Sequence, residues 1–193
     1  MSSILKVDTI QDSSGNNIIN ESSNTITIGA SGDTTNIVGT LQNDGASLAN
    51  TPSFAVRLSG SQSIANATNT VLQFNTEDWD TDSAYDTSSY RFVVPSGGAG
   101  KYFFHARVYI EWGNAAGEIG RLQIAKNGTA MAIDAMTESG DPTSGSSIRI
   151  TTLLDLAVAD YVDVRLYHNQ GGSQDADNDS DFTYFTGYKL IGA

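Results

Sequence analysis

Cysteine is absent from this 193-residue chain, so no disulfide can staple the fold and no thiolate can serve as a nucleophile or zinc ligand. Positive charge is scarce, because 10 Lys and Arg residues stand against 22 Asp and Glu and leave a net charge of −12. A surface this acidic repels phosphate backbones and anionic lipid headgroups. We therefore expect neither nucleic acid nor a membrane among the partners.

Long apolar runs are missing as well, since none approaches the roughly 18–20 residues that a membrane helix requires. The N-terminus lacks the basic start and apolar core of a signal peptide. We expect the chain to be made in a host cytoplasm and kept there until another route, such as lysis, releases it.

Aromatic residues are absent from positions 1–53, and all of them follow from Phe54 onward. The early segment contains short Ile, Val and Leu groups between Ser, Gly and Asn turns, which predict strands. The expected strands are Asn17–Ile19, Thr25–Gly29 and Asn36–Leu41. Strands this short cannot offset roughly 1–2 kcal/mol of backbone entropy per residue on their own. We expect residues 1–51 to form an anchor or stalk, intertwined with identical copies or docked on a partner, with a mobile tail as the alternative.

The remainder of the chain is rich in β-branched and aromatic residues between Gly, Asn and Asp turns. Lys101–Trp112 has the composition of a central strand, and Asn127-Gly128 predicts a hairpin turn. Tyr90–Phe104 predicts two strands joined as a hairpin, because Pro95 ends the first strand and the following glycines permit a reversal. No window sustains a helical period. The sequence therefore predicts an all-β, antiparallel sandwich of about ten strands.

Residues 52–193 also contain short motifs in a defined order. They are Pro52–Val56, Val71–Asn75, Tyr85-Asp86, Phe92–Phe104, Leu122–Gly128, Ala159–Val164 and Phe185–Leu190. In this order they resemble the jelly roll shared by tumour necrosis factor and the globular heads of complement. The resemblance implies a jelly-roll domain over 52–193 and a tight homotrimer, with aromatic and aliphatic side chains around a three-fold axis. No collagen repeat precedes this head, so its stalk must be of another kind.

The opening run from Ile4 to Asp12, followed by a Gly-Asn turn, resembles the start of tail-fibre and other virion proteins of bacteriophages, especially marine and cyanobacterial ones. It implies a virion structural protein on the capsid or tail surface, attached through its N-terminal segment to capsid or tail proteins. The anchoring residues would be Ile4, Leu5, Val7 and Ile10. Two roles stay open: a capsid decoration protein, and a receptor-binding tail fibre that contacts a host surface glycan or protein. A non-viral trimeric ligand-binding module is the remaining alternative.

Catalysis has little support. His105 and His168 each lie inside an apolar strand, where a histidine more often has a structural role than that of a general base. No nucleophile elbow, phosphate-binding loop or metalloprotease motif occurs. We expect a protein that is not an enzyme and assign no catalytic residue.

Two acidic loops place a carboxylate at every second position, a spacing that can point several oxygens at one calcium ion. The residues are Asp78, Asp80 and Asp82 in one loop, and Asp175, Asp177, Asp179 and Asp181 in the other. Neither loop has the glycine at position six or the glutamate at position twelve of an EF-hand. A solvated acidic loop is the alternative, so we expect no cofactor and keep calcium as the one candidate.

Three aromatic residues lie near the ends of expected strands: Trp79, Tyr85 and Trp112. Amphipathic rings at such positions often contact sugars or proteins. They could equally pack in a trimer interface or in the core, and the sequence leaves these alternatives open.

Overall fold

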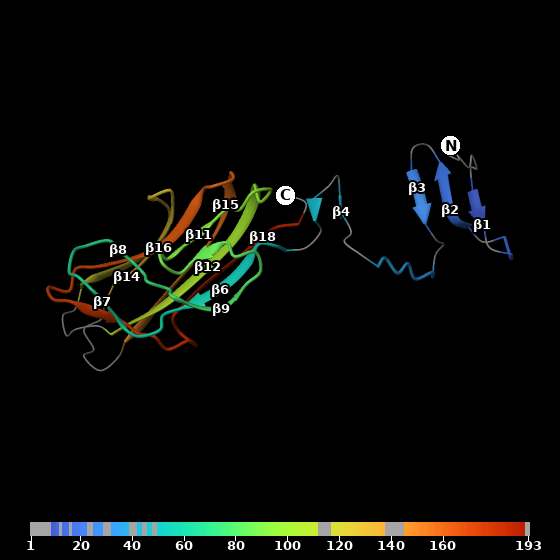
Figure 1. Cartoon of the computed structure of the whole chain (residues 1–193). Coiled ribbons are helices and arrows are strands. Elements are labelled where there is room, and N and C mark those ends of the chain that lie inside the picture. Colours follow the sequence, from blue (N-terminus) through green and yellow to red (C-terminus); the bar gives the residue numbers. More distant parts are fainter. Residues whose placement is uncertain are drawn as a thin grey trace. The chain divides into compact units, whose positions relative to one another are not determined.

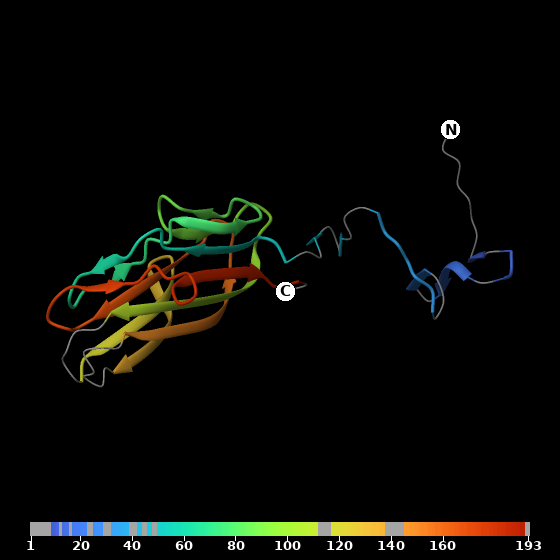
Figure 2. The same cartoon turned by 90° about the horizontal axis from the view of Figure 1, so that it is seen from below.

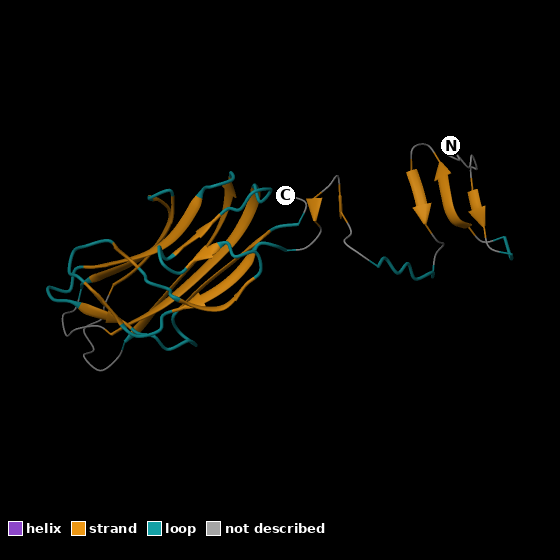
Figure 3. Ribbon diagram, viewed as in Figure 1, coloured by secondary structure: helices purple, strands orange, loops and turns teal. Residues whose placement is uncertain are grey.

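The computed structural model describes residues 9–11, 13–15, 17–22, 25–28, 32–38, 42–43, 46–47, 50–111, 117–137 and 145–191. The chain divides into two units, Met1–Gly45 and Ala46–Ala193. The described residues consist of strands and loops (Figure 3). This part of the chain has no helix that is long and apolar enough to cross a bilayer.

The first unit contains an antiparallel sheet of β1 (Thr9–Gln11), β2 (Asn17–Ser22) and β3 (Thr25–Ile28), in that order (Figure 1). The strands expected near residues 17 and 25 are therefore confirmed. The described residues of the third expected strand, 36–38, are not in a strand, which corrects that prediction. Two further strands have only two residues each: β4 (Gln42–Asn43) belongs to the first unit and β5 (Ala46–Ser47) to the second.

The pairing of this small sheet aligns three isoleucines in one cross-strand row. Ile10 lies opposite Ile19, and Ile19 lies opposite Ile28. Their side chains are 39%, 37% and 54% exposed. We call Ile10, Ile19 and Ile28 the isoleucine row.

The second unit is a sandwich of two antiparallel sheets with a jelly-roll-like arrangement. One sheet has the order β10-β11-β16-β13-β14 with β8 beside β16, and the other the order β7-β17-β12-β18-β6-β9 with β15 beside β12. Figure 2 shows β6, β18, β12 and β15 side by side. The bounds are β6 Ser53–Arg57, β7 Gln62–Ile64, β8 Thr70–Val71, β9 Thr76–Asp80, β10 Tyr85–Asp86, β11 Arg91–Val93, β12 Gly100–Glu111, β13 Ile119–Lys126, β14 Thr129–Thr137, β15 Ser146–Leu156, β16 Tyr161–His168, β17 Gln174–Ala176 and β18 Tyr184–Lys189. The all-β, antiparallel prediction is confirmed, and the described strands outnumber the ten expected because several have only two or three residues.

The core between the two sheets is built around phenylalanine rings. Every second residue of β12 faces inward, because side chains alternate along a strand, and these inward residues are fully buried. The Phe54 ring lies 4.9 Å from Phe185 of the same sheet and 5.2 Å from Phe92 of the facing sheet. Such ring pairs contribute about 0.5–1.5 kcal/mol beyond the burial of their area. The sandwich therefore has a continuous aromatic core, which the aromatic-free first 53 residues could not supply.

The hairpin expected over Tyr90–Phe104 is wrong. Its two strands lie in different sheets, β11 beside β16 and β12 beside β18, so the Pro- and Gly-rich connection crosses the sandwich. Phe92 faces Tyr102 and Phe104 across the core, with ring centroids 5.3 and 5.7 Å apart. Pro95 and the glycines specify a change of chain direction. The inward aromatic residues of β11 and β12 then favour packing of the two strands across the core over hydrogen-bonded pairing within one sheet.

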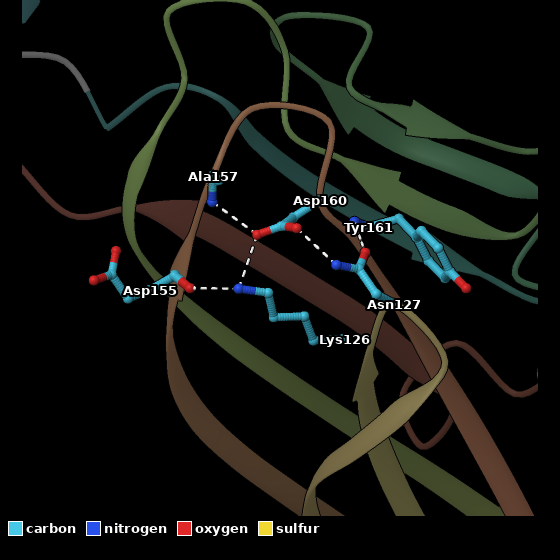
Figure 4. Close-up of polar contacts among 6 residues, drawn as sticks. All are labelled: Lys126, Asn127, Asp155, Ala157, Asp160 and Tyr161. Atoms are coloured by element: carbon cyan, nitrogen blue, oxygen red, sulfur yellow. Dashed lines mark hydrogen bonds and ion pairs between the residues drawn. The ribbon is translucent and has the colours of Figure 1, made fainter.

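The Asn127-Gly128 hairpin is confirmed, since β13 and β14 pair directly and both turn residues have positive φ, 49° and 83°. Figure 4 shows how Asp160 holds this turn against the β15–β16 turn. Its carboxylate lies 2.8 Å from the Lys126 Nζ and accepts hydrogen bonds from Asn127 Nδ2 at 2.7 Å and the Ala157 N–H at 2.8 Å. Two loops far apart in sequence are thus joined at one carboxylate.

Candidate interaction surface

The seven-stranded sheet has an outward side that carries aromatic and aliphatic side chains. Phe103 on β12 lies between Tyr188 on β18 and Leu153 on β15, and residues directly opposite one another share a face. Trp79, Ala55, Thr186, His105 and Thr151 form a second row across the same side. We call the following residues the aromatic face: Trp79, Phe103, His105, Tyr109, Leu153, Phe182, Tyr184 and Tyr188.

The rings of this face contact one another in pairs. Phe103 stacks on Tyr188 with centroids 5.1 Å apart, and His105 lies 5.6 Å from Tyr184. Trp79 is 53% exposed, Leu153 62% and Phe182 39%. The outward side of a solvated antiparallel sheet is ordinarily polar, and an exposed apolar patch marks an interaction site.

Polar groups on the aromatic face hold its rings in place. His105 Nδ1 lies 2.8 Å from Thr151 Oγ1, and its Nε2 lies 3.3 Å from the Tyr184 hydroxyl. The Arg107 guanidinium lies over the Phe182 ring at 4.6 Å, a cation–π contact. Burial lowers the pKa of His105, and Arg149 and Arg107 lower it further. The imidazole is therefore favoured in its neutral form.

A second apolar patch lies on the edge strand β14. Met131 is 51% exposed and Ile133 58%. Within the described residues β14 pairs with β13 alone and lies close to β15 of the facing sheet, so it is the outward side of β14 that can meet another surface. We call Met131 and Ile133 the edge patch.

Of the two expected aromatic contact residues that the structure describes, Trp79 lies on the surface and Tyr85 does not. Tyr85 is 4% exposed and stacks on Phe54 at 5.2 Å, so the expected surface contact is corrected to a core role. Burial also raises the pKa of the Tyr85 hydroxyl. Trp112 lies outside the described residues.

The first acidic segment is only partly a loop, because Asp78 and Asp80 lie in β9 and only Asp82 follows it, which corrects the prediction. Its carboxylates bond to protein groups. Asp78 Oδ1 lies 2.8 Å from the Arg57 Nε, and Asp80 Oδ2 accepts the Tyr85 N–H at 2.8 Å. Asp82 accepts a hydrogen bond from the Thr81 hydroxyl at 3.1 Å. The first contact joins β9 to β6, and the second joins β9 to β10.

The second acidic loop follows the same pattern. Asp177 Oδ1 accepts the Asp179 N–H at 2.8 Å, and Asp179 Oδ1 accepts the Asp181 N–H at 2.9 Å, while Asp175 lies in β17. Among the described residues, no three His, Cys, Asp or Glu side chains gather as a metal ion would require. The expectation of no cofactor stays a prediction, with calcium as the one candidate.

The two histidines have separate surroundings. His168 is fully buried, with Nε2 2.8 Å from the Ile64 carbonyl and Nδ1 accepting the Gln170 N–H at 3.3 Å. His105 belongs to the aromatic face. No described carboxylate hydrogen-bonds to either imidazole, as the base of a catalytic triad would need.

Of the expected anchoring residues, Ile10 lies in β1 as part of the isoleucine row, and Ile4, Leu5 and Val7 lie outside the described residues. Sequence reasoning missed Phe103, Leu153, Tyr184 and Tyr188 as surface residues. The sequence of β12 could have indicated this surface. Apolar and aromatic residues occupy both odd and even positions of the strand, a pattern typical of strands that are covered on both faces.

Comparison with known proteins gives matches over the second unit. The model of the C1q domain matches residues 53–190. Among solved structures, the globular domain of zebrafish complement 1qA is 14% identical, with 72% of this chain and 98% of that chain covered and a TM-score of 0.49. Murine APRIL at pH 5.0 is 12% identical, with the same coverage and a TM-score of 0.51. No curated protein matches the chain. At 12% identity the likeness to murine APRIL shows the fold alone.

Proposed function

The chain belongs to the C1q domain family, and from this premise we propose that it is a homotrimeric surface module whose jelly-roll head binds a partner and catalyses no reaction. The observation that carries the proposal is the aromatic face. Its rings and aliphatic side chains are partly exposed in a single chain. Covering apolar surface contributes about 25 cal/mol per Å², which favours association through this side of the sheet.

Two distinct apolar patches support a closed ring. A ring with three-fold symmetry needs a heterologous interface, in which one patch of each protomer meets a different patch of the next. The aromatic face and the edge patch are two such surfaces on one domain. We propose that the edge patch of one protomer packs on the aromatic face of its neighbour.

The isoleucine row extends the same reasoning to the first unit. A small sheet with one exposed apolar row is marginal in water without a further layer. A trimer brings three copies of this sheet together, and we propose that their isoleucine rows pack against one another as a short stalk.

The setting that we propose is the surface of a bacteriophage virion, where the N-terminal segment attaches to capsid or tail proteins. Its support is the resemblance of Ile4–Asp12 to virion proteins, in a part of the chain that the C1q match does not reach. Capsid decoration and a receptor-binding tail fibre are both compatible with this architecture. A ligand-binding module outside a virion is the second candidate, favoured by the family match alone.

The trimer interface is tested by placing a charge on it. Leu153→Glu should shift the mass in solution from trimer towards monomer, because a buried carboxylate without a partner disfavours the interface. Val158→Glu is the matched control, since Val158 is also exposed but lies in the β15–β16 turn. Both residues are exposed in the single chain, so neither change should lower the free energy of unfolding of that chain. A Leu153→Glu protein that keeps the wild-type mass would contradict the proposed interface.

The virion setting needs a separate experiment. Particles labelled at the C-terminal head and imaged by electron microscopy should carry the label over the capsid or at the tail. Label over the capsid indicates decoration, and label at the tail indicates a fibre. Particles without label would reject the setting and leave the trimeric module in place.

A further inference from the structure

An open groove lies at the end of the sandwich where β7 and β8 are found. Its volume is about 480 Å³, within the range of ligand sites. It is lined by Leu58, Ser59, Gly60, Ser61, Gln62, Ser63, Thr70, Gln73 and Asn75. None of these residues is charged, although the chain has a net charge of −12. The chemistry of the groove is that of hydroxyl and amide groups.

Two side-chain amides fix the walls of this groove. Gln62 donates from Nε2 to the Val71 carbonyl at 2.9 Å and accepts the Gln73 N–H on Oε1 at 2.8 Å. Asn75 Oδ1 accepts the Ser59 N–H at 2.9 Å. The loop after β6 is thereby joined to the segment around β8. A site held in this way loses little conformational entropy when a ligand binds.

Other polar groups remain available to a ligand. The Gln73 amide and the Ser63 hydroxyl are exposed and bond to no other described side chain or backbone group. Together they offer donors and acceptors that can exchange water for the hydroxyl groups of a ligand.

The groove faces away from the place where the chain enters the sandwich. Ser53 pairs with Tyr188, so the start of β6 and the end of β18 lie at one end. Figure 1 shows β7 and β8 at the opposite end of the same unit. The groove therefore lies at the end of this unit that is remote from Ser53, where the chain enters the sandwich.

We propose that this groove binds a neutral saccharide. The inference rests on the proposed binding role of the head and names the class of its ligand. Uncharged hydroxyl and amide groups match the hydroxyls of a sugar and offer no counter-charge to an acidic glycan or a charged peptide. No aromatic ring lines the groove to stack on a sugar face, so the affinity per site is low and gains from three copies in a trimer.

Saturation-transfer NMR on the full chain tests the proposal with glucose, galactose, mannose, N-acetylglucosamine and their neutral oligomers, beside sialylated and sulfated glycans. We expect a signal from at least one neutral sugar. The double change Ser63→Ala with Gln73→Ala should raise the Kd for that sugar about tenfold or more. A tenfold rise corresponds to a loss of roughly 1.4 kcal/mol of binding free energy, as expected when hydrogen bonds to the sugar are removed. Thr129→Ala, an exposed hydroxyl on β14 away from the groove, is the control and should bind as the wild type does.

Melting temperatures of all variants check that they are folded, and the mass in solution is recorded for each. Absence of binding to every neutral sugar would overturn the proposal, as would binding of acidic glycans alone or neutral-sugar binding that the groove variant leaves unchanged. If the wild type is a trimer without sugar binding, the groove proposal fails and the proposed assembly stands. If sugar binds to a monomer, the assembly fails and the groove stands.

Discussion

Asp160 is the single carboxylate that joins the two turns at one end of the sandwich (Figure 4). Hydrogen bonds from Lys126, Asn127 and the Ala157 N–H lower its pKa from 3.8 to about 2. Because the pKa in the folded state is lower than in the unfolded state, the stabilisation is complete above pH 3.8 and is lost as the pH falls towards 2.

Asp160→Asn should therefore be less stable than the wild type at pH 7, and the difference should shrink between pH 4 and about 2. Urea unfolding at a series of pH values measures it. A difference that stays constant over this range would show that the carboxylate charge is not what stabilises the turns.

Gly187 is the one residue of β18 that faces inward without a side chain. A Cβ at this position would lie 2.6 Å from Phe104 Cδ1 and 2.9 Å from Phe54 Cε1. We expect Gly187→Ala to lower the free energy of unfolding by about 1–3 kcal/mol, the usual cost of overpacking.

Chemical denaturation measures the effect of Gly187→Ala. Gly172→Ala is the control, since a Cβ there meets no atom within 4 Å. Equal stability of the two variants would contradict the packing shown for the core rings.

At the scale of elements, the acidic loops lead to a prediction about metal removal. Their described carboxylates accept hydrogen bonds from nearby backbone groups and side chains, and no three of them gather around one point. We expect the melting temperature to be the same with calcium and with a chelator. A rise of several degrees with calcium, abolished by Asp177→Asn with Asp179→Asn, would establish a calcium site in the second loop.

Strand composition and turn residues were enough to predict the sheet class and the β13–β14 hairpin. Asn127 and Gly128 specify their turn locally, because both adopt positive φ at little cost. Pro95 and its glycines specify a turn too, but whether the flanking strands pair or face one another depends on Phe92, Tyr102 and Phe104 meeting across the core. That is a tertiary effect, so the sequence led to the wrong hairpin.

The interaction surface was predicted less completely than the fold. Trp79 was expected on a surface from its position near a strand end, yet Tyr85, chosen for the same reason, is buried by Phe54 and Phe185. The aromatic face depends on the register of three strands distant in the chain, which aligns Phe103 with Tyr188 and Leu153. Local sequence does not contain that register.

At the scale of the whole molecule, we expect the proposed assembly to depend on pH through His105. Its lowered pKa means that the folded chain favours the neutral imidazole, and burial in a trimer interface would favour it further. Protonation would add a third positive charge beside Arg107 and Arg149. We therefore expect the trimer to weaken once the pH falls below the pKa of His105 in the single folded chain, which itself lies below the ordinary value of 6.5.

Sedimentation at pH 7.5 and pH 5.5 measures this dependence. His105→Gln keeps polar groups near Thr151 and Tyr184 but cannot be protonated, so its assembly should change less with pH. An equal change in wild type and His105→Gln would assign the pH effect to other groups.

The central claim is that identical chains associate through the aromatic face, and the mass of the full chain in solution tests it most directly. Light scattering coupled to size exclusion should give three times the chain mass of 20.4 kDa at neutral pH. A mass of one chain at every concentration measured would contradict the account. It would also contradict the proposed packing of the isoleucine rows.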